Sequence, residues 1–225
     1  MQVRGVIFDC DGTLLDSMGA WREVESDLAR RAGVVLSEEE VELLGANTLP
    51  QTARYFHELY EIGFTTEAVG KEMEEGLYRY YRDQVEPREG VLDFVGALAE
   101  VGVKMSVASS SPRYLLETGL ARVGLLSFMD TVVSVSDTGV SKREPVTIDR
   151  ARESMGTERC FTWGFEDSLY AIEVLKRAGY HAIGVHDRDE AGSLADLKRA
   201  ADHAVDEFGD LDVSLFLKGG YAKKV

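Results

Sequence analysis

The chain has 225 residues, of which 44% are hydrophobic, and carries a formal net charge of −15 at pH 7. That length can bury a full core plus a smaller domain, while the acidic balance argues against a nucleic-acid partner, because affinity for a phosphate backbone depends on clustered Lys and Arg. No stretch approaches the roughly 20 apolar residues of a membrane span, and the first residues lack the layout of a secretory signal, so we expect a cytoplasmic protein with no membrane partner.

An apolar run at residues 3–8 predicts a buried strand, and two acids, Asp9 and Asp11, stand where it ends. A carboxylate in such a place is costly unless a cation or a hydrogen-bond donor neutralises it. Open α/β sheets build their sites at the carboxyl ends of strands, so this pair is a candidate for chemistry. A strand that ends in an ordinary Asp-Gly turn is the simpler alternative.

The next part of the chain, residues 17–85, contains several helical stretches and no convincing strand. Ser37 and Glu40 have the spacing of a capping box at the start of one of them. We therefore expect an all-helical cap domain of residues 17–85, inserted into a core domain of residues 1–16 and 86–225, with the two crossings acting as a hinge. The predicted helices span residues 21–32, 37–44, 49–60 and 66–81.

From residue 90 onward, alternating strand and helix patterns predict a doubly wound parallel sheet of the α/β class. The strand predicted at residues 103–108 leads into Ser109, Ser110, Ser111 and Pro112. A hydroxyl at a strand end, followed by backbone N–H groups that open a helix, favours a bound anion. An ordinary Ser cap before a helix that starts with Pro is the alternative.

Lys142 follows a predicted strand at residues 131–135 and precedes a helix that we expect to begin around Pro145. A compact ammonium in this place would neutralise charge between a carboxylate and a bound anion. A lysine that is simply solvated is the alternative.

Two adjacent acids, Glu166 and Asp167, follow a predicted strand at residues 160–164, and a helical pattern then runs over residues 169–179. Acids are weakly favoured at any helix N-terminus, which is the simple explanation of the pair. The functional explanation is a divalent metal, since Mg²⁺ prefers hard oxygen ligands and takes few of them from the protein.

Four features, taken in chain order, resemble the four motifs of the haloacid dehalogenase superfamily. They are the string Phe-Asp-Cys-Asp-Gly-Thr-Leu-Leu-Asp-Ser from residue 8, then Ser109, Lys142 and the acidic pair. The resemblance covers nearly the whole chain and is closest to the branch with a helical cap after the first motif, which contains β-phosphoglucomutases and phosphoglycolate phosphatases. The third motif departs from the common Gly-Lys-Pro-x-Pro-Asp, because Arg143 follows the lysine. The spacing from Lys142 to Pro145 is kept, so we assign Lys142 rather than Arg143.

The resemblance implies a Rossmann-like core that carries the reaction of a Mg²⁺-dependent phosphohydrolase on a small phosphorylated metabolite. The Asp9 carboxylate would attack phosphorus and form an aspartyl-phosphate, and Asp11 would serve as general acid and then general base. Ser109, Ser110 and Lys142 would bind the transferring phosphoryl group.

The same resemblance implies the metal ligands. Mg²⁺ would be held by the side chains of Asp9 and Asp167 and by the backbone carbonyl of Asp11, with Glu166 adjacent or acting through water. As an assembly, we expect a monomer or a weak homodimer.

Three other functions share this framework. A phosphomutase would use the same centre with a cap that holds a second phosphate, but the nearest cation to the cap loop is Arg54, one turn into a helix. A haloacid dehalogenase would need Asp9 without a metal, and Asp11 and the acidic pair argue against it. A non-catalytic binding protein on the same fold would not need the complete set of acid, metal and phosphate residues.

Within the cap, Asn47 and Thr48 lie in a loop between two predicted helices and could present polar groups to the leaving portion of a substrate. Trp21 could lie in the crevice between cap and core. Ordinary turn chemistry explains the loop equally well, and packing between cap and core is the alternative role of Trp21. For Tyr78, Tyr80 and Tyr81, helix packing is the expected role.

Overall fold

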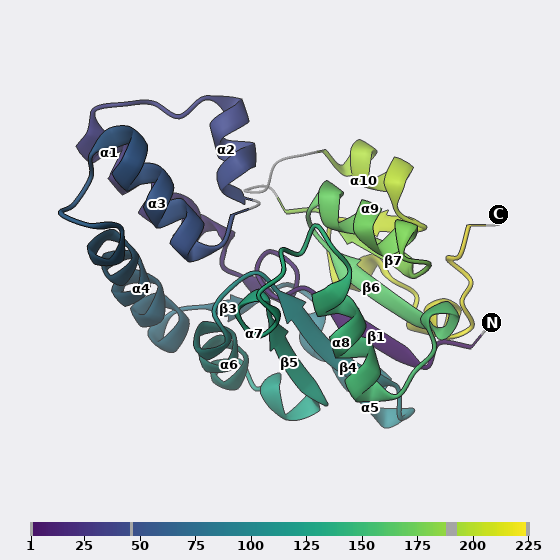
Figure 1. Cartoon of the computed structure of the whole chain (residues 1–225). Helices are drawn as coiled ribbons and strands as arrows, with labels where there is room; N and C mark the ends of the chain where they lie inside the picture. The colour runs from purple at the N-terminus through teal and green to yellow at the C-terminus, as the bar shows by residue number, and fades with distance from the viewer. Residues whose placement is uncertain (1, 46, 188–192, 224–225) are drawn as a thin grey trace.

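The computed structural model describes residues 2–45, 47–187 and 193–223 (Figure 1). Within these residues the core is a sheet of six parallel strands in the order β5-β4-β1-β6-β7-β8, which confirms the predicted fold class. Its strands are β1 (Gly5–Phe8), β4 (Lys104–Ser109), β5 (Thr131–Ser134), β6 (Thr162–Glu166), β7 (His181–Val185) and β8 (His203–Val205).

The central strand β1 is apolar on both sides because helices cover both faces of the sheet. Val6 and Phe8 pack into one buried cluster together with α5 and α6, while Ile7 packs into a second cluster with α8, α9 and α10. Figure 1 shows α8 and α9 on the near side of the sheet. These helices are α5 (Val91–Glu100), α6 (Arg113–Arg122), α8 (Val146–Met155), α9 (Leu169–Arg177) and α10 (Leu194–Ala200).

The strand order reverses next to β1, which is the place where open α/β sheets form a crevice. The chain passes from β1 to β4 and β5 on one side and then returns to β6 on the other. Phe8 is paired with Val107 of β4 and with Phe165 of β6. Asp9, Ser109 and Glu166 therefore all fall within two residues of the same level at the carboxyl end of the sheet.

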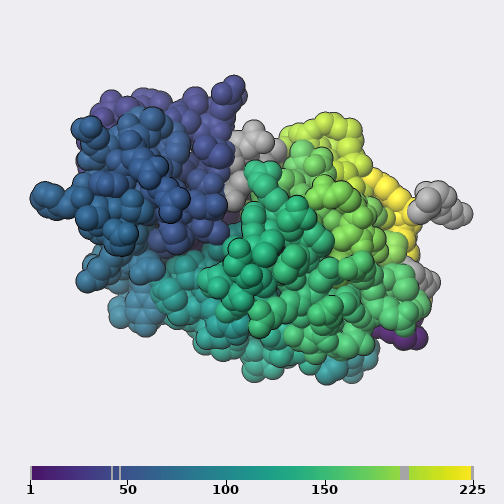
Figure 2. Space-filling model, in the orientation of Figure 1, coloured from purple at the N-terminus to yellow at the C-terminus, as the bar shows by residue number. Residues whose placement is uncertain are grey.

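Four helices between the first and second core strands form a separate lobe, drawn in purple and blue in Figure 1 and packed against the core in Figure 2. This confirms the helical insertion. The short strands β2 and β3 pair antiparallel where the chain crosses between the lobes. The boundaries of the cap domain, at residues 17 and 85, stay a prediction. The elements are α1 (Met18–Ala32), α2 (Glu38–Gly45), α3 (Leu49–Tyr60), α4 (Thr66–Asp83), β2 (Leu15–Asp16) and β3 (Glu86–Pro87).

The cap contacts the core through a close approach of α4 to α6 at Gly119. A Cβ atom on this glycine would come 2.8 Å from Leu15 Cδ1 and 2.9 Å from Tyr81 Cδ1. Glycine is thus needed for packing here, and the contact fixes the C-terminal end of α4 beside the hinge.

The remaining short elements are α7 (Val135–Thr138), α11 (Val213–Leu217) and the 3₁₀ turns η1 (Leu126–Phe128), η2 (Arg159–Phe161) and η3 (Phe208–Asp210).

Several predicted boundaries differ from the structure by one to three residues, and two of them lie beside the candidate site. The strand expected at residues 160–164 begins at Thr162 and runs through Glu166, because residues 159–161 form a 3₁₀ turn instead. The helix expected from Trp21 begins at Met18. The predicted capping box at Ser37 is confirmed, with the Ser37 backbone N–H donating to a Glu40 carboxylate oxygen at 2.7 Å.

Among the helices in the described ranges, none combines the length and apolar character needed to cross a membrane.

Candidate active site

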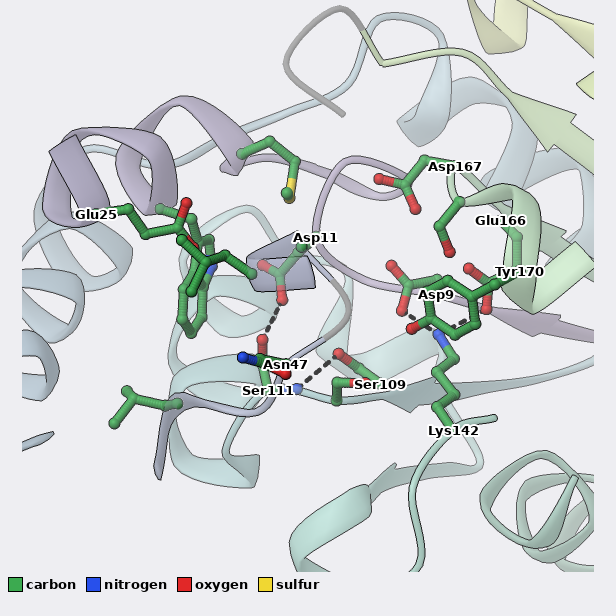
Figure 3. Close-up of a pocket in the computed structure, with 17 residues that line it drawn as sticks. Asp9, Asp11, Glu25, Asn47, Ser109, Ser111, Lys142, Glu166, Asp167 and Tyr170 are labelled. Atoms are coloured by element: carbon green, nitrogen blue, oxygen red, sulfur yellow. Dashed lines mark hydrogen bonds and ion pairs between the residues drawn. The ribbon is translucent and has the colours of Figure 1, made fainter. Parts of the chain in front are cut away.

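A cavity lies between the cap and the carboxyl ends of β1, β4 and β6 (Figure 3). The core side is lined by the acids and serines that follow these strands and by Lys142. The cap side is lined by residues of α1, by the end of α2 and by the loop that follows it. The crevice expected from the strand order is therefore closed on its open side by the inserted helices.

Asp9 and Lys142 form the centre of the core side. Lys142 Nζ lies 2.5 Å from Asp9 Oδ1 and 2.6 Å from Glu166 Oε1, and all three side chains are buried. Burial raises the pKa of Asp9, and the neighbouring ammonium opposes that shift. Burial also acts to lower the pKa of Lys142, but Asp9 and Glu166 outweigh it and raise the pKa. Lys142 is thus an ammonium held between the carboxyl groups of Asp9 and Glu166.

The sequence analysis assigned Lys142 rather than Arg143, and the two side chains lie in different places. The Lys142 ammonium enters the cavity, whereas the guanidinium of Arg143 lies over the ring of Tyr170, 4.9 Å from its centroid. Pro145 directly precedes α8, which begins at Val146. The geometry therefore supports Lys142 as the cation of the site.

Asp9, Glu166 and Asp167 form a buried acidic cluster in which each residue offers an oxygen within 4.8 Å of the others. Oxygen ligands of this kind suit a small hard divalent cation. Gly12 has a positive φ of 77°, and a Cβ atom there would collide with the Asp167 carboxylate. The glycine after the second acid of the first motif is therefore needed both for the turn and for the space that Asp167 occupies.

Asp11 is engaged by three hydroxyl groups. Ser17 Oγ donates to Asp11 Oδ1 at 2.7 Å, and Ser111 Oγ donates to Asp11 Oδ2 at 2.6 Å. The hydroxyl of Tyr81 also donates to Asp11 Oδ1. Because the Ser17 hydroxyl is used in this way, Ser17 precedes α1 without making a side-chain cap. Asp11 is thus oriented jointly by a core loop, the hinge and the cap.

Tyr81 is the functional candidate that the sequence did not reveal. It packs as expected, with no exposed surface, but its hydroxyl also receives a hydrogen bond from Trp21 Nε1 at 2.9 Å and passes one on to Asp11. Burial raises the pKa of Tyr81 well above its ordinary value, and the Asp11 carboxylate adds to the shift, so the phenol stays protonated and donates. The buried positions of α4 recur every four residues and end at Tyr81, next to the hinge, which is the signal that could have found it.

The three consecutive serines have different partners. Ser109 Oγ accepts a hydrogen bond from the backbone N–H of Ser111 at 3.2 Å, which orders the loop, and Ser110 lines the cavity. Ser111, which the sequence left without a role, holds Asp11. Roles of Ser109 and Ser110 in binding a phosphoryl group stay predictions.

The cap residues separate into two groups. Trp21 and Asn47 line the cavity. Thr48 instead lines a neighbouring groove and forms a capping box with Gln51, whose side-chain oxygen accepts from the Thr48 hydroxyl at 2.9 Å. A further acid of α1, Glu25, lines the cavity although it is only 4% exposed. Burial raises the pKa of Glu25, and its ion pair with Arg22 partly opposes the shift.

The chain is similar to known proteins in sequence and in fold. A family model described as haloacid dehalogenase-like hydrolase matches residues 6–185. The validoxylamine A 7'-phosphate phosphatase of Streptomyces hygroscopicus subsp. limoneus is 26% identical over 192 residues, which cover 84% of this chain and 89% of the relative. The fructose-1-phosphate phosphatase YqaB of Escherichia coli is 26% identical over 183 residues, which cover 80% of this chain and 95% of the relative.

Among solved structures, CbbY from Rhodobacter sphaeroides in complex with phosphate matches with a TM-score of 0.79 and 18% sequence identity, over 93% of this chain and 96% of that one. At 18% sequence identity, this similarity is evidence for the fold alone.

Fold, site and relatives together define a hydrolase of phosphoric monoesters whose α/β core carries a helical insertion. The chain belongs to the haloacid dehalogenase-like hydrolase family.

Proposed function

We propose that the protein is a Mg²⁺-dependent phosphatase that hydrolyses a small phosphorylated metabolite through an aspartyl-phosphate on Asp9. The observation that carries the proposal is the environment of Asp9. This buried carboxylate has an ammonium on one oxygen and the acidic cluster with Glu166 and Asp167 within reach. Such a set neutralises and orients a carboxylate nucleophile opposite an anionic substrate.

In the proposed reaction, an Asp9 oxygen attacks phosphorus, the bond from phosphorus to the leaving oxygen breaks, and Asp11 gives that oxygen its proton. Asp11 then takes a proton from water, and the water oxygen attacks phosphorus, which releases phosphate and restores the Asp9 carboxylate. Lys142 and the serine loop after β4 would hold the equatorial oxygens of the phosphoryl group. The hydrogen bonds from Ser17, Ser111 and Tyr81 support the role of Asp11, because they fix its orientation.

The donor set fits Mg²⁺, since three buried carboxylates offer only oxygen ligands. When bound, the ion would supply positive charge that offsets the repulsion between the phosphate and the Asp9 carboxylate. Asp9 and Asp167 would hold it, together with the backbone carbonyl of Asp11. Glu166 already pairs with Lys142, so we propose that it acts beside the ion by fixing this lysine and by completing the cluster.

A phosphomutase is the second candidate on the same centre, and it would need a cation in the cap for a second phosphate. Arg54, the nearest cation to the cap loop in the sequence, is exposed on α3 and lies 4.0 Å from Glu58, away from the cavity. This placement favours hydrolysis over transfer between two positions of one sugar.

The test is hydrolysis of p-nitrophenyl phosphate with and without Mg²⁺. We expect turnover that requires the ion and is lost in excess chelator. Asp9→Asn should remove turnover by on the order of 10⁵-fold or more, because an amide cannot form the acyl-phosphate. Asp16→Asn is the matched control, since Asp16 is exposed on β2 and does not line the cavity. Near-normal turnover by Asp9→Asn would refute the proposal.

A further inference from the structure

The charges that line the cavity are strongly unbalanced. Among its described lining residues there are five carboxylates and one ammonium. The ammonium is Lys142, which is already held between Asp9 and Glu166. Mg²⁺ and the phosphoryl group account for the acids at the strand ends. On the cap side the lining acid is Glu25, and its partner Arg22 does not itself line the cavity. An anionic group on the leaving portion of a substrate would therefore meet a carboxylate rather than a positive partner.

Two arginines beside the cavity, Arg22 and Arg113, are each paired with an acid, and Arg143 lies over the ring of Tyr170. Arg22 Nη1 lies 3.0 Å from Glu25 Oε2 on the same helix. Arg113, in the neighbouring groove between cap and core, contacts Asp137 at 2.7 Å and Glu117 at 3.6 Å. Recruiting either arginine to a substrate anion would break an existing ion pair, so neither is a ready anion site.

Glu25 is the acid on the cap side of the cavity. In Figure 3 it projects from the cap, on the side of Asp11 that faces away from Asp9. Trp21, Leu44 and Leu49 line the cavity from the same lobe, and Asn47 adds an amide. Together they provide an apolar wall with one hydrogen-bonding amide and one acceptor carboxylate. Such a surface suits a carbon skeleton that carries hydroxyl or ammonium donors.

We propose that the leaving portion of the substrate is a neutral or cationic polyol or amino sugar that donates a hydrogen bond to Glu25, and that leaving portions with a carboxylate or a second phosphate are rejected. The proposal rests on the phosphatase function proposed above and adds the class of substrate. Glu25 is a specificity residue in it and has no part in the bond-breaking steps.

The experiment compares three phosphomonoesters in which the same terminal carbon carries the phosphate: those of sorbitol, glucosamine and gluconate. Sorbitol phosphate and phosphogluconate differ only at the far end, where a hydroxymethyl group replaces a carboxylate. We expect kcat/KM for phosphogluconate to be lower than for sorbitol phosphate by about tenfold or more, because its carboxylate would be repelled by the carboxylate of Glu25. The glucosamine ester should be cleaved at least as well as the sorbitol ester.

Variants of Glu25 then assign the discrimination to this residue. Glu25→Gln keeps the size of the side chain and removes its charge, so the preference for sorbitol phosphate over phosphogluconate should fall severalfold. Glu25→Asp keeps the charge and should retain the preference. Glu23→Gln is the control, because Glu23 is exposed on the same helix and does not line the cavity.

p-Nitrophenyl phosphate, which has no donor for Glu25, separates the two proposals. If the wild-type protein fails to hydrolyse it in Mg²⁺, the phosphatase function is refuted and the substrate class with it. If it is hydrolysed while phosphogluconate is cleaved as well as sorbitol phosphate, only the substrate class is overturned. The same holds if Glu25→Gln and Glu23→Gln show the wild-type preference. Turnover of p-nitrophenyl phosphate by each variant also shows that it is folded.

Discussion

The strand ends of the core and the inserted helices contribute to one cavity in different ways. On the core side, the candidate residues follow consecutive strands, and the register of β1 with β4 and β6 brings them to one level. On the cap side, Trp21, Glu25 and Asn47 come from a helix face and a loop. The positions of these three residues depend on how the cap helices pack, because the described part of the cap has no hydrogen-bonded strand register comparable to that of the core sheet. We infer that the residues at the strand ends carry out the reaction and that the residues of the inserted helices select the substrate.

Asp11 is an exception to this division between core and cap, because side chains of both lobes position it. Its carboxylate belongs to the core, but Tyr81 of α4 donates to it and Trp21 of α1 donates to Tyr81. A displacement of the cap would therefore change the environment of the candidate acid and base. We infer that cap side chains position the Asp11 carboxylate in addition to covering the strand ends.

Among the variants that test this comparison of core and cap, the largest effect should come from Lys142, the cation on the core side. Lys142→Met leaves Asp9 and Glu166 buried without the ammonium that pairs them, so we expect kcat on p-nitrophenyl phosphate to fall by about 10³-fold. Arg143→Met is the matched control, because Arg143 lies over Tyr170. Steady-state kinetics of both variants would test the contrast. Equal losses in the two would contradict the assignment of Lys142.

A smaller effect should come from the cap residue that reaches the core. Tyr81→Phe removes one of three donors to Asp11, and we expect kcat to fall by about tenfold with little change in KM, since a hydrogen bond to a charged group contributes about 1.5–3 kcal/mol. Tyr80→Phe is the control, because the Tyr80 hydroxyl donates to the Asp16 backbone carbonyl instead. An unchanged kcat in Tyr81→Phe would restore a strict division between core and cap.

Asn47 and Thr48 are adjacent in the cap loop and sharpen the comparison further. Asn47→Ala should change the ranking of good substrates severalfold and leave p-nitrophenyl phosphate turnover nearly unchanged, because Asn47 lines the cavity. Thr48→Ala should lower stability by about 1 kcal/mol through loss of the α3 cap without changing that ranking. Kinetics over a substrate panel and thermal unfolding would separate the two. A shift in ranking with Thr48→Ala alone would reverse the assignment.

The same comparison explains what the sequence could reveal. The fold class, the helical insertion and the family followed from patterns local in sequence: a strand, then a polar residue, repeated in order. Tyr81 and Glu25 could not be found in this way, because their roles depend on which helix face meets the cavity after packing. A buried tyrosine and an acid beside an arginine are common in helices that pack ordinarily. The four-residue period of buried positions in α4 places Tyr81 on the inner face of the helix, but only the tertiary structure shows that its hydroxyl and the Glu25 carboxylate reach the site.

The smallest predicted effect concerns the stability of the cap itself. Glu40 Oε1 accepts hydrogen bonds from Tyr55 and Tyr60, each at 2.5 Å, and Glu40 also closes the capping box with Ser37. These hydrogen bonds, that from Tyr55 first, lower the pKa of Glu40 from 4.5 to about 2. A carboxyl whose pKa is lowered by folding stabilises the native state fully above its unfolded pKa, and the contribution is lost as the pH falls through the folded pKa.

Glu40→Gln should therefore be less stable than the wild type at neutral pH, and the gap should narrow as the pH falls from 4.5 towards 2. Glu39→Gln, at an exposed neighbour in the same first turn of α2, should show no such narrowing. Urea unfolding of the three proteins at several pH values measures the difference. Because Glu40 lies outside the cavity, turnover of p-nitrophenyl phosphate at neutral pH should stay the same in both variants. A constant gap at all pH values would mean that the two tyrosines hold the protonated and ionised forms of Glu40 equally well.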